Sequence, residues 1–361
     1  MALQGQDMNI GYVLVPFGLG AVVVAGVTPV LIRIARRHGY YDKADGRKIH
    51  PAGISPLGGI ALFIGMASAG LAAMLWGSHP FSGRLAVAFA LGFTPIFAVS
   101  VWDDLRPLPW WLRLLVQAAG AVLFTIVQDP IGRLNLPFLG QVYPGRWSHV
   151  LVVVWLLLTT NALNFIDGLD GLAAGVAAIA GVALLVSAYG AGFVAPVALA
   201  AALVGVCVGF LPYNFPPAKI FMGDSGATLL GYVLGVMALV GAGKNVALVS
   251  LLLPLLVLGV PIADAIGAIA RRTYRGRRIF EADREHVHHR LLSLGLGYRR
   301  TVLLLYMVTA LLGGLGLFLA TGPRVSVVFV VVLAAACSAL FFRRRAGGGP
   351  RSASGGGREG D

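Results

Sequence analysis

The chain has 361 residues, of which 58% are hydrophobic and only 12% are charged, and its mean hydropathy is +0.83. A soluble protein of this length could not bury so much apolar surface, so the composition excludes a soluble globular protein and predicts an integral membrane protein. The net charge of +13 would suit a nucleic-acid partner, but the distribution of the basic residues argues against one.

Apolar stretches of bilayer-spanning length predict an all-α polytopic membrane protein with about eleven transmembrane helices. No cleavable signal is expected, because the first apolar run is long and lacks a basic start. Only Gly190-Ala191-Gly192 separates the sixth span from the seventh. The predicted spans are residues 11–32, 57–76, 84–101, 111–128, 148–163, 171–189, 192–212, 225–242, 246–270, 301–320 and 325–342.

The basic residues predict an external amino terminus and a cytoplasmic carboxyl terminus. With this orientation, all but five of the 28 Lys and Arg fall on the cytoplasmic side, as the positive-inside rule requires. Topology, together with attraction to anionic lipid and to phosphate-bearing substrates, then explains the charge without nucleic acid. The five exceptions are Arg84, Arg133, Arg146, Lys244 and Arg324.

The first cytoplasmic loop contains Arg47-Lys48-Ile49-His50, followed by a Pro/Gly-rich approach to the second span. This approach could bring Lys48 and His50 back over the membrane face, where such cations bind phosphate. After the third span comes the pair Asp103-Asp104. Adjacent carboxylates repel each other and favour a cation, either a basic side chain or Mg²⁺; a solvated loop with Arg106 as counter-charge is the simpler alternative.

The fifth span leads into Asn161-Ala-Leu-Asn164-Phe-Ile-Asp167-Gly-Leu-Asp170-Gly171, directly before the next apolar run. An Asp at the centre of a membrane helix costs about 2.5–3.5 kcal/mol on insertion scales, so these polar groups indicate a cavity or a functional site. A polar turn is the alternative. Before this segment, residues 129–147 form the longest external loop, with room for a short hairpin.

The seventh span ends in Asn214-Phe-Pro-Pro-Ala-Lys219-Ile-Phe221-Met-Gly-Asp224-Ser-Gly. Asp224 could ligate a metal, Lys219 could meet a phosphate and Phe221 could stack on a base, although ordinary packing explains Phe221 equally well. Asp264 lies inside the ninth span without an assigned role.

The loop 271–300 contains His286-Val-His288-His289-Arg290. Three His within four residues suggest zinc, but no Cys joins them, and a diphosphate site fits the carboxylates better. Cys207 and Cys337 lie in predicted spans, so no disulfide framework is expected. Residues 1–345 are predicted to form one membrane domain, and 346–361 a disordered tail.

The predicted topology places five polar segments on the cytoplasmic face: Arg47–His50, Asp103-Asp104, Asn161–Asp170, Asn214–Asp224 and His286–Arg290. Carboxylates with Lys, Arg and His make a site for Mg²⁺ and a diphosphate, where the metal neutralises charge on the phosphoryl group under attack. The apolar body beside the site could hold a lipid. The interpretation is an enzyme that joins a water-soluble nucleotide substrate to a membrane-embedded acceptor.

These motifs resemble those of the polyprenyl-phosphate N-acetylhexosamine-1-phosphate transferase superfamily, glycosyltransferase family 4. The resemblance implies transfer of a sugar-1-phosphate from a UDP-sugar to undecaprenyl phosphate, with release of UMP and with Mg²⁺ or Mn²⁺. The His-x-His-His-Arg pattern and Arg47-Lys48-x-His50 are similar to the UDP-N-acetylglucosamine branch, which starts teichoic acids, O-antigen or related envelope glycans. The peptidoglycan branch, which uses UDP-N-acetylmuramoyl-pentapeptide, typically has an uninterrupted His triplet followed by Phe-Glu, and this chain has neither. Ala44 and Gly53 stand where the family often has Pro.

The resemblance also implies roles for individual residues. Asp224, with Asp103 and Asp104, would bind the metal. Asp103 would handle the proton of the lipid phosphate, whereas an older rival scheme makes an Asp such as Asp167 the nucleophile of a double displacement. The groups implied to face the diphosphate or the sugar are His288, His289 and Arg290. The substrate-binding residues implied are Lys48, His50, Asn161, Asn164, Asp170, Asn214, Lys219, Phe221 and His286.

The implied partners are UDP-N-acetylglucosamine, undecaprenyl phosphate and the lipid bilayer. The implied location is the bacterial inner membrane, with a multi-pass chain and a cytoplasmic active site. The sequence leaves the oligomeric state open, a homodimer included. Two other classes remain as alternatives: a transporter, which would place its charges near the membrane midplane and often shows inverted repeats, and a catalytically silent scaffold for glycan assembly.

Overall fold

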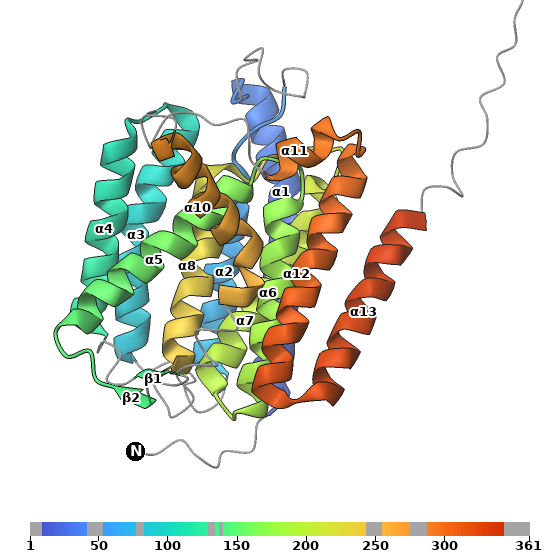
Figure 1. Cartoon of the computed structure of the whole chain (residues 1–361). Coiled ribbons are helices and arrows are strands. Elements are labelled where there is room, and N and C mark those ends of the chain that lie inside the picture. Colours follow the sequence, from blue (N-terminus) through green and yellow to red (C-terminus); the bar gives the residue numbers. More distant parts are fainter. Residues whose placement is uncertain are drawn as a thin grey trace, which may run out of the picture.

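A computed structural model describes residues 9–41, 53–76, 83–128, 134–136, 140–242, 255–274 and 287–342. These residues form a bundle of helices with one small two-stranded hairpin (Figure 1). In chain order the helices are α1 Gly11–His38, α2 Gly58–Leu75, α3 Gly83–Leu105, α4 Trp110–Val127, α5 Trp147–Ile166, α6 Leu172–Gly190, α7 Val194–Asn214, α8 Gly223–Ala242, α10 Gly259–Tyr274, α11 Val287–Ser293, α12 Tyr298–Thr321 and α13 Pro323–Phe342.

Ten helices in the described ranges are long and apolar enough to cross a membrane, which makes this a multi-pass helical protein. They coincide with ten of the predicted spans. The ninth predicted span, 246–270, is described only from Leu255, and α10, which begins in it and ends four residues beyond it, has 16 residues. The total of eleven and the orientation of the termini therefore stay predictions.

Two local predictions about connections are confirmed. The loop between α4 and α5 contains an antiparallel hairpin of β1 Leu134–Leu136 and β2 Gly140–Val142. The break between α6 and α7 occurs at the expected glycines, where Gly192 has a φ of 74°. A positive φ costs glycine little, so the chain can reverse within three residues and start α7 at Val194.

Aromatic side chains mark the two ends of the bundle. We call the end where α3 finishes and α8 begins the site end. Tryptophan and tyrosine prefer the two interfaces of a bilayer, so these rings support an orientation in which the helices of the bundle span the membrane. The exposed rings include Trp102, Trp110 and Trp111 at the site end, and Trp76, Tyr143 and Trp147 at the hairpin end.

Helices α7 and α8 are the most buried spans, whereas α13 packs mainly on α12 and is largely exposed. Glycines let α1 approach α7 closely: a Cβ added at Gly205 would lie 2.2 Å from the carbonyl oxygen of Phe17, and one at Gly209 would lie 2.4 Å from that of Ala21. Small residues support such close helix packing in membranes.

Gly205→Ala should therefore destabilise the bundle. Overpacking typically costs about 1–3 kcal/mol. That cost is expected here because the new methyl group would meet backbone rather than a flexible side chain. Gly26→Ala on α1 is the matched control, since nothing lies within 4 Å of the added Cβ. We expect thermal unfolding in detergent to show a lower midpoint for Gly205→Ala only; equal midpoints would contradict the close α1–α7 contact.

Candidate active site

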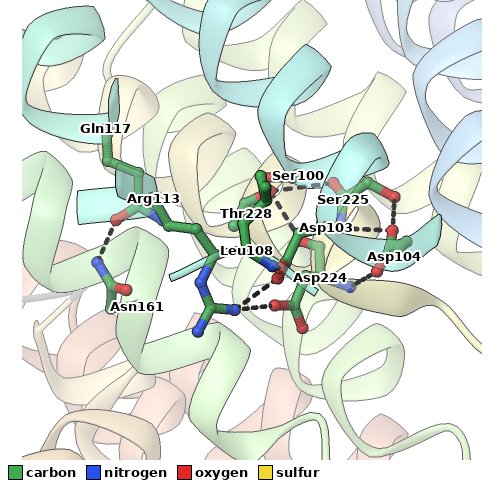
Figure 2. A network of polar contacts seen from close by, with 10 residues as sticks. All are labelled: Ser100, Asp103, Asp104, Leu108, Arg113, Gln117, Asn161, Asp224, Ser225 and Thr228. Atoms are coloured by element: carbon green, nitrogen blue, oxygen red, sulfur yellow. Dashed lines mark hydrogen bonds and ion pairs between the residues drawn. The ribbon is translucent and has the colours of Figure 1, made fainter. Parts of the chain in front are cut away.

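One guanidinium joins two carboxylates at the site end. The Nη1 atom of Arg113 donates to Asp103 Oδ2 and to Asp224 Oδ2, at 2.6 Å each (Figure 2). Asp103 comes from the last turn of α3, Arg113 from the first turn of α4, and Asp224 from the first turn of α8. The expectation that the Asp pair needs a cation is confirmed for Asp103. The cation is Arg113, whereas Arg106 is exposed.

Asp104 is turned away from this ion pair and toward the start of α8. Its carboxylate accepts the backbone N–H groups of Asp224 at 2.6 Å and of Ser225 at 3.1 Å, and also the hydroxyl of Ser225. The first N–H groups of a helix lack partners within the helix, and a carboxylate there is favoured by the helix dipole. Asp104 therefore caps α8; its predicted metal and catalytic roles stay predictions.

Gly223 makes this arrangement sterically feasible. Its φ is 73°, in the region that favours glycine. An added Cβ would lie 2.5 Å from the carbonyl oxygen of Pro56 and within 2.7 Å of both carboxylate oxygens of Asp104. The glycine before Asp224 thus lets the segment preceding α2 and the end of α3 meet at the start of α8.

Helix α5 brings its two asparagines to the same region. Asn164 lies close to the carboxylate of Asp224. Asn161 donates through Nδ2 to Gln117 Oε1 at 2.7 Å and to the carbonyl oxygen of Leu157 at 2.8 Å. Gln117 lies one turn after Arg113 on α4 (Figure 2). One face of α4 therefore contacts Asp103 and Asp224 through Arg113, and Asn161 through Gln117.

The second half of the α5 motif is tied to the segment after α7. Asp170 Oδ2 accepts the N–H of Ala218 at 2.9 Å. Asn214 accepts the N–H of Gly171 at 3.0 Å and donates to the carbonyl oxygen of Ile220 at 3.0 Å. Asp170 and Asn214 are both buried. These three bonds form a clasp, the pairing of 170–171 with 214–220, and the substrate-binding roles predicted for both residues stay predictions.

Two tyrosines of α12 support the clasp from the other side. The hydroxyl of Tyr298 accepts the N–H of Asp170 at 3.0 Å, and the hydroxyl of Tyr306 donates to the carbonyl oxygen of Gly171. Arg299 lies 5.3 Å from the centre of the Phe215 ring, in cation–π range. Helix α12 therefore helps to fix the loops around the site.

Phe221 is positioned by its backbone. Its N–H donates to the carbonyl oxygen of Ser55 at 2.9 Å, and its carbonyl oxygen accepts the N–H of Gly58 at 3.0 Å. The described part of the Pro/Gly-rich approach to α2 thus docks beside the site. Lys219 is exposed on the same segment. Lys48 and His50 lie outside the described residues.

Asp264, which the sequence left without a role, holds the start of α11. Its Oδ1 accepts the N–H of Val287 at 3.0 Å, and the side chain is 3% exposed. Helix α11 carries His288, His289 and the exposed Arg290. The side chains of the two histidines, and all of His286, lie outside what the structure describes, so their predicted roles are not tested.

Asp167 follows the last residue of α5, and its surroundings disfavour the charged form of its carboxyl group. Desolvation raises the pKa of Asp167 well above its usual range, and the negative charges of Asp224, Asp104 and Asp170 add to the rise. The residue thus belongs electrostatically to the same group of carboxylates, and the folded protein favours its protonated form.

The donor set fits a divalent cation with few protein ligands. Across the described residues, no group of three or more His, Cys, Asp or Glu side chains is arranged to hold a metal. However, Asp103 Oδ2 and Asp224 Oδ2 converge on one cation. Mg²⁺ prefers oxygen ligands and commonly uses one or two carboxylates together with substrate phosphates and water. The two residues therefore suit Mg²⁺ better than a metal enclosed entirely by protein.

Sequence reasoning missed several residues that organise the site. Arg113 was counted only as a topology signal, although a cation at the start of an apolar helix, shortly after an Asp pair, is a recognisable feature. Ser225 was quoted within its motif but given no role. No local signal in the sequence marks the buried Gln117, or Tyr298 and Tyr306, which support the clasp.

Comparisons with known proteins agree with this site. A family model described as "Glycosyl transferase family 4" matches residues 86–242, which include Asp103, Arg113 and Asp224. A Bacillus subtilis protein, named "Probable undecaprenyl-phosphate N-acetylglucosaminyl 1-phosphate transferase", is 36% identical over 297 residues, 82% of each chain. The chain belongs to glycosyl transferase family 4. The resemblance stated from the motifs is thereby confirmed.

Other members of glycosyl transferase family 4 show its breadth. A Mycolicibacterium smegmatis "Decaprenyl-phosphate N-acetylglucosaminephosphotransferase" is 36% identical over 327 residues, covering 80% of this chain and 78% of the relative. A Lactiplantibacillus plantarum "Phospho-N-acetylmuramoyl-pentapeptide-transferase" is 33% identical over 288 residues, covering 74% and 87%. This chain is therefore similar both to relatives named for N-acetylglucosamine and to relatives named for N-acetylmuramoyl-pentapeptide.

Removing the cap of α8 should be costly. In Asp104→Ala, the N–H groups of Asp224 and Ser225 lose their acceptor, and we expect a loss of about 1–3 kcal/mol of unfolding free energy. Asp104→Asn keeps one acceptor oxygen and should lose less. Chemical unfolding in detergent would measure both variants. An alanine variant as stable as wild type would contradict the capping role.

Asp167→Asn should make the protein more stable at neutral and alkaline pH. Because the folded-state pKa of Asp167 is raised, its contribution is fully favourable only below the unfolded value of about 3.9, and is lost as pH rises through the folded pKa. The difference in unfolding temperature between variant and wild type should therefore grow with pH. A difference that does not change between pH 4 and pH 8.5 would contradict this assignment.

Proposed function

We propose that this protein is a Mg²⁺-dependent enzyme that transfers N-acetylglucosamine-1-phosphate from UDP-N-acetylglucosamine to undecaprenyl phosphate and releases UMP. The observation that carries the proposal is the convergence of Asp103 and Asp224, from two separate helices, on a single cation position at the site end. Similarity to relatives that carry polyprenyl-phosphate N-acetylglucosamine phosphotransferase names supports it.

In the proposed reaction, the lipid phosphate attacks directly. Asp103 takes or holds off the proton of that phosphate, and the N–H of Leu108 fixes its other carboxylate oxygen at 2.6 Å. The phosphate oxygen forms a bond to the β-phosphorus of the UDP-sugar. The bond between this phosphorus and the bridging oxygen breaks, and UMP leaves with the electron pair.

Asp103 and Asp224 would hold Mg²⁺, with Mn²⁺ as a substitute. The metal would neutralise charge on the transferring phosphoryl group. Asn164 lies beside Asp224 and would help to orient that carboxylate, while the clasp fixes the loop that carries Asp167. A double displacement through Asp167 would need an ionised nucleophile, and the raised pKa of Asp167 disfavours that form. We propose the direct route, in which Asp167 forms no bond to the sugar phosphate.

The proposed setting is the bacterial inner membrane, with the site end in the cytoplasm. UDP-sugars are water-soluble, whereas a polyprenyl phosphate keeps its chain among lipids. A site at the end of a helical bundle, level with the rings of Trp102, Trp110 and Trp111, gives both substrates access. The product would begin an envelope glycan such as a teichoic acid or an O-antigen.

The peptidoglycan branch is the second candidate, because the Lactiplantibacillus plantarum relative carries its name. The His-x-His-His-Arg pattern favours N-acetylglucosamine as the donor sugar. Only a comparison of donors separates the two branches, since the carboxylates near Arg113 act on the diphosphate that both donors share.

Purified protein with Mg²⁺ and undecaprenyl phosphate should convert sugar-labelled UDP-N-acetylglucosamine into labelled lipid. Asp103→Asn and Asp224→Asn should lower the rate by about 10²-fold or more, since each loses an ionised group used in the reaction. Chelation by EDTA should stop transfer, and added Mg²⁺ should restore it. Retained unfolding temperature would show that the variants are folded.

The donor decides between the branches. Product formed only from the muramoyl-pentapeptide donor would keep the chemistry and move the protein to peptidoglycan synthesis. Product from neither donor, with folded protein and active reference enzyme in the same membrane mimic, would refute the proposed reaction. Full activity of Asp103→Asn would refute the proton role of Asp103 alone.

A further inference from the structure

Arg113 stands where the two metal-binding carboxylates of the proposed function converge. Its Nη1 atom is 2.6 Å from Asp103 Oδ2 and 2.6 Å from Asp224 Oδ2. We propose that Arg113 is an exchangeable counter-ion, which holds these carboxylates together while no metal is bound and is released toward a substrate phosphate when a divalent cation takes its place. The inference rests on the proposed function, because the metal and the phosphates belong to it.

The guanidinium and the metal would compete for the same atoms. Mg²⁺ binds carboxylate oxygens at about 2.0–2.1 Å, and Nη1 already contacts one oxygen of each carboxylate, Asp103 Oδ2 and Asp224 Oδ2. Two cations at these oxygens would repel each other strongly in a partly buried site. A metal that bridges these two oxygens therefore excludes Arg113 from its present position.

Arg113 has the freedom and the chemistry to move. Its side chain is 36% exposed, whereas that of Asp103 is 9% exposed. Both carboxylate contacts use Nη1, and Figure 2 shows the other terminal nitrogen pointing away from the two carboxylates. A guanidinium stays charged at all relevant pH values, and its planar set of donors matches a phosphate.

A purely structural role for Arg113 makes the opposite prediction. An ion pair that only ties α3, α4 and α8 together would position the carboxylates for the metal, so its loss would weaken metal binding or leave it unchanged. An exchangeable counter-ion is a competitor, so its loss should strengthen metal binding. The sign of the change in affinity therefore separates the two roles.

Binding of Mn²⁺ to the purified full-length protein, without substrates, provides the test. Electron paramagnetic resonance of free Mn²⁺ would give the Kd. We expect Arg113→Gln to lower the Kd by about tenfold, because a competing charge-assisted contact to each carboxylate is removed, and Arg113→Lys to stay near wild type. Arg106→Gln, which makes the same charge change at an exposed position before α4, should leave the Kd unchanged.

An unchanged or higher Kd in Arg113→Gln would overturn the inference. Asp224→Asn should abolish tight Mn²⁺ binding both in the wild-type protein and in the Arg113→Gln variant. Wild-type protein allows a second measurement that needs no variant. Phenylglyoxal, read by mass spectrometry, should modify Arg113 faster once Mg²⁺ is added; a rate that stays the same or falls would also overturn the inference.

These outcomes separate the inference from the proposed function. Wild type that binds no Mn²⁺ would refute both the metal site and the role of Arg113. Tighter binding by Arg113→Gln, in a protein that transfers neither sugar, would support the counter-ion while refuting the proposed reaction. Active transfer with an unchanged Kd would refute the counter-ion alone.

Discussion

The arrangement of the site end depends on how negative charge is balanced inside an apolar bundle. Asp103 and Asp224 lie on helices that the chain separates widely, and they face one another across a single guanidinium. Without a cation, two carboxylates at this separation would repel each other and push α3 and α8 apart. The site therefore needs a cation between these two carboxylates, and in this structure that cation is Arg113.

The start of α8 is the second fixed point. Asp104 satisfies the first N–H groups of this helix, and Gly223 leaves room for the approach to α2. Three segments far apart in the chain meet there, at the end of one of the most buried helices. Adjacent residues of the Asp pair thus do different work: Asp103 faces the cation, and Asp104 holds the helix that carries Asp224.

Much of the polar chemistry near the site is used to build it. Asp170 and Asn214 bind backbone groups of the opposite loop, and Asp264 holds the first turn of α11. Buried polar groups are costly unless they are hydrogen-bonded. Satisfying them with backbone partners fixes the loops, which is what a site must provide to hold reacting groups in one geometry.

The amino-acid sequence by itself determined the membrane class, ten of the spans, the hairpin after α4 and the break before α7. These features follow from local hydropathy and from glycines that tolerate unusual backbone angles, so nearby residues are sufficient to specify them. The motifs around Asp103, Asp167 and Asp224 were also recognisable, because carboxylates at the ends of apolar runs are costly and therefore informative.

Only the tertiary structure decided which polar groups meet. Arg113 and Asp224 are 111 residues apart in the chain, and Asp104 and Asp224 are 120 apart. Nothing in the spacing of one motif shows which side of a distant helix it will face. From the sequence, Arg113 therefore served only as a topology signal, and Asp104 received the same predicted metal-binding role as Asp103. Packing of α3, α4 and α8 gave these residues their partners, because each helix can satisfy a buried charge only with the groups that its neighbours bring to it.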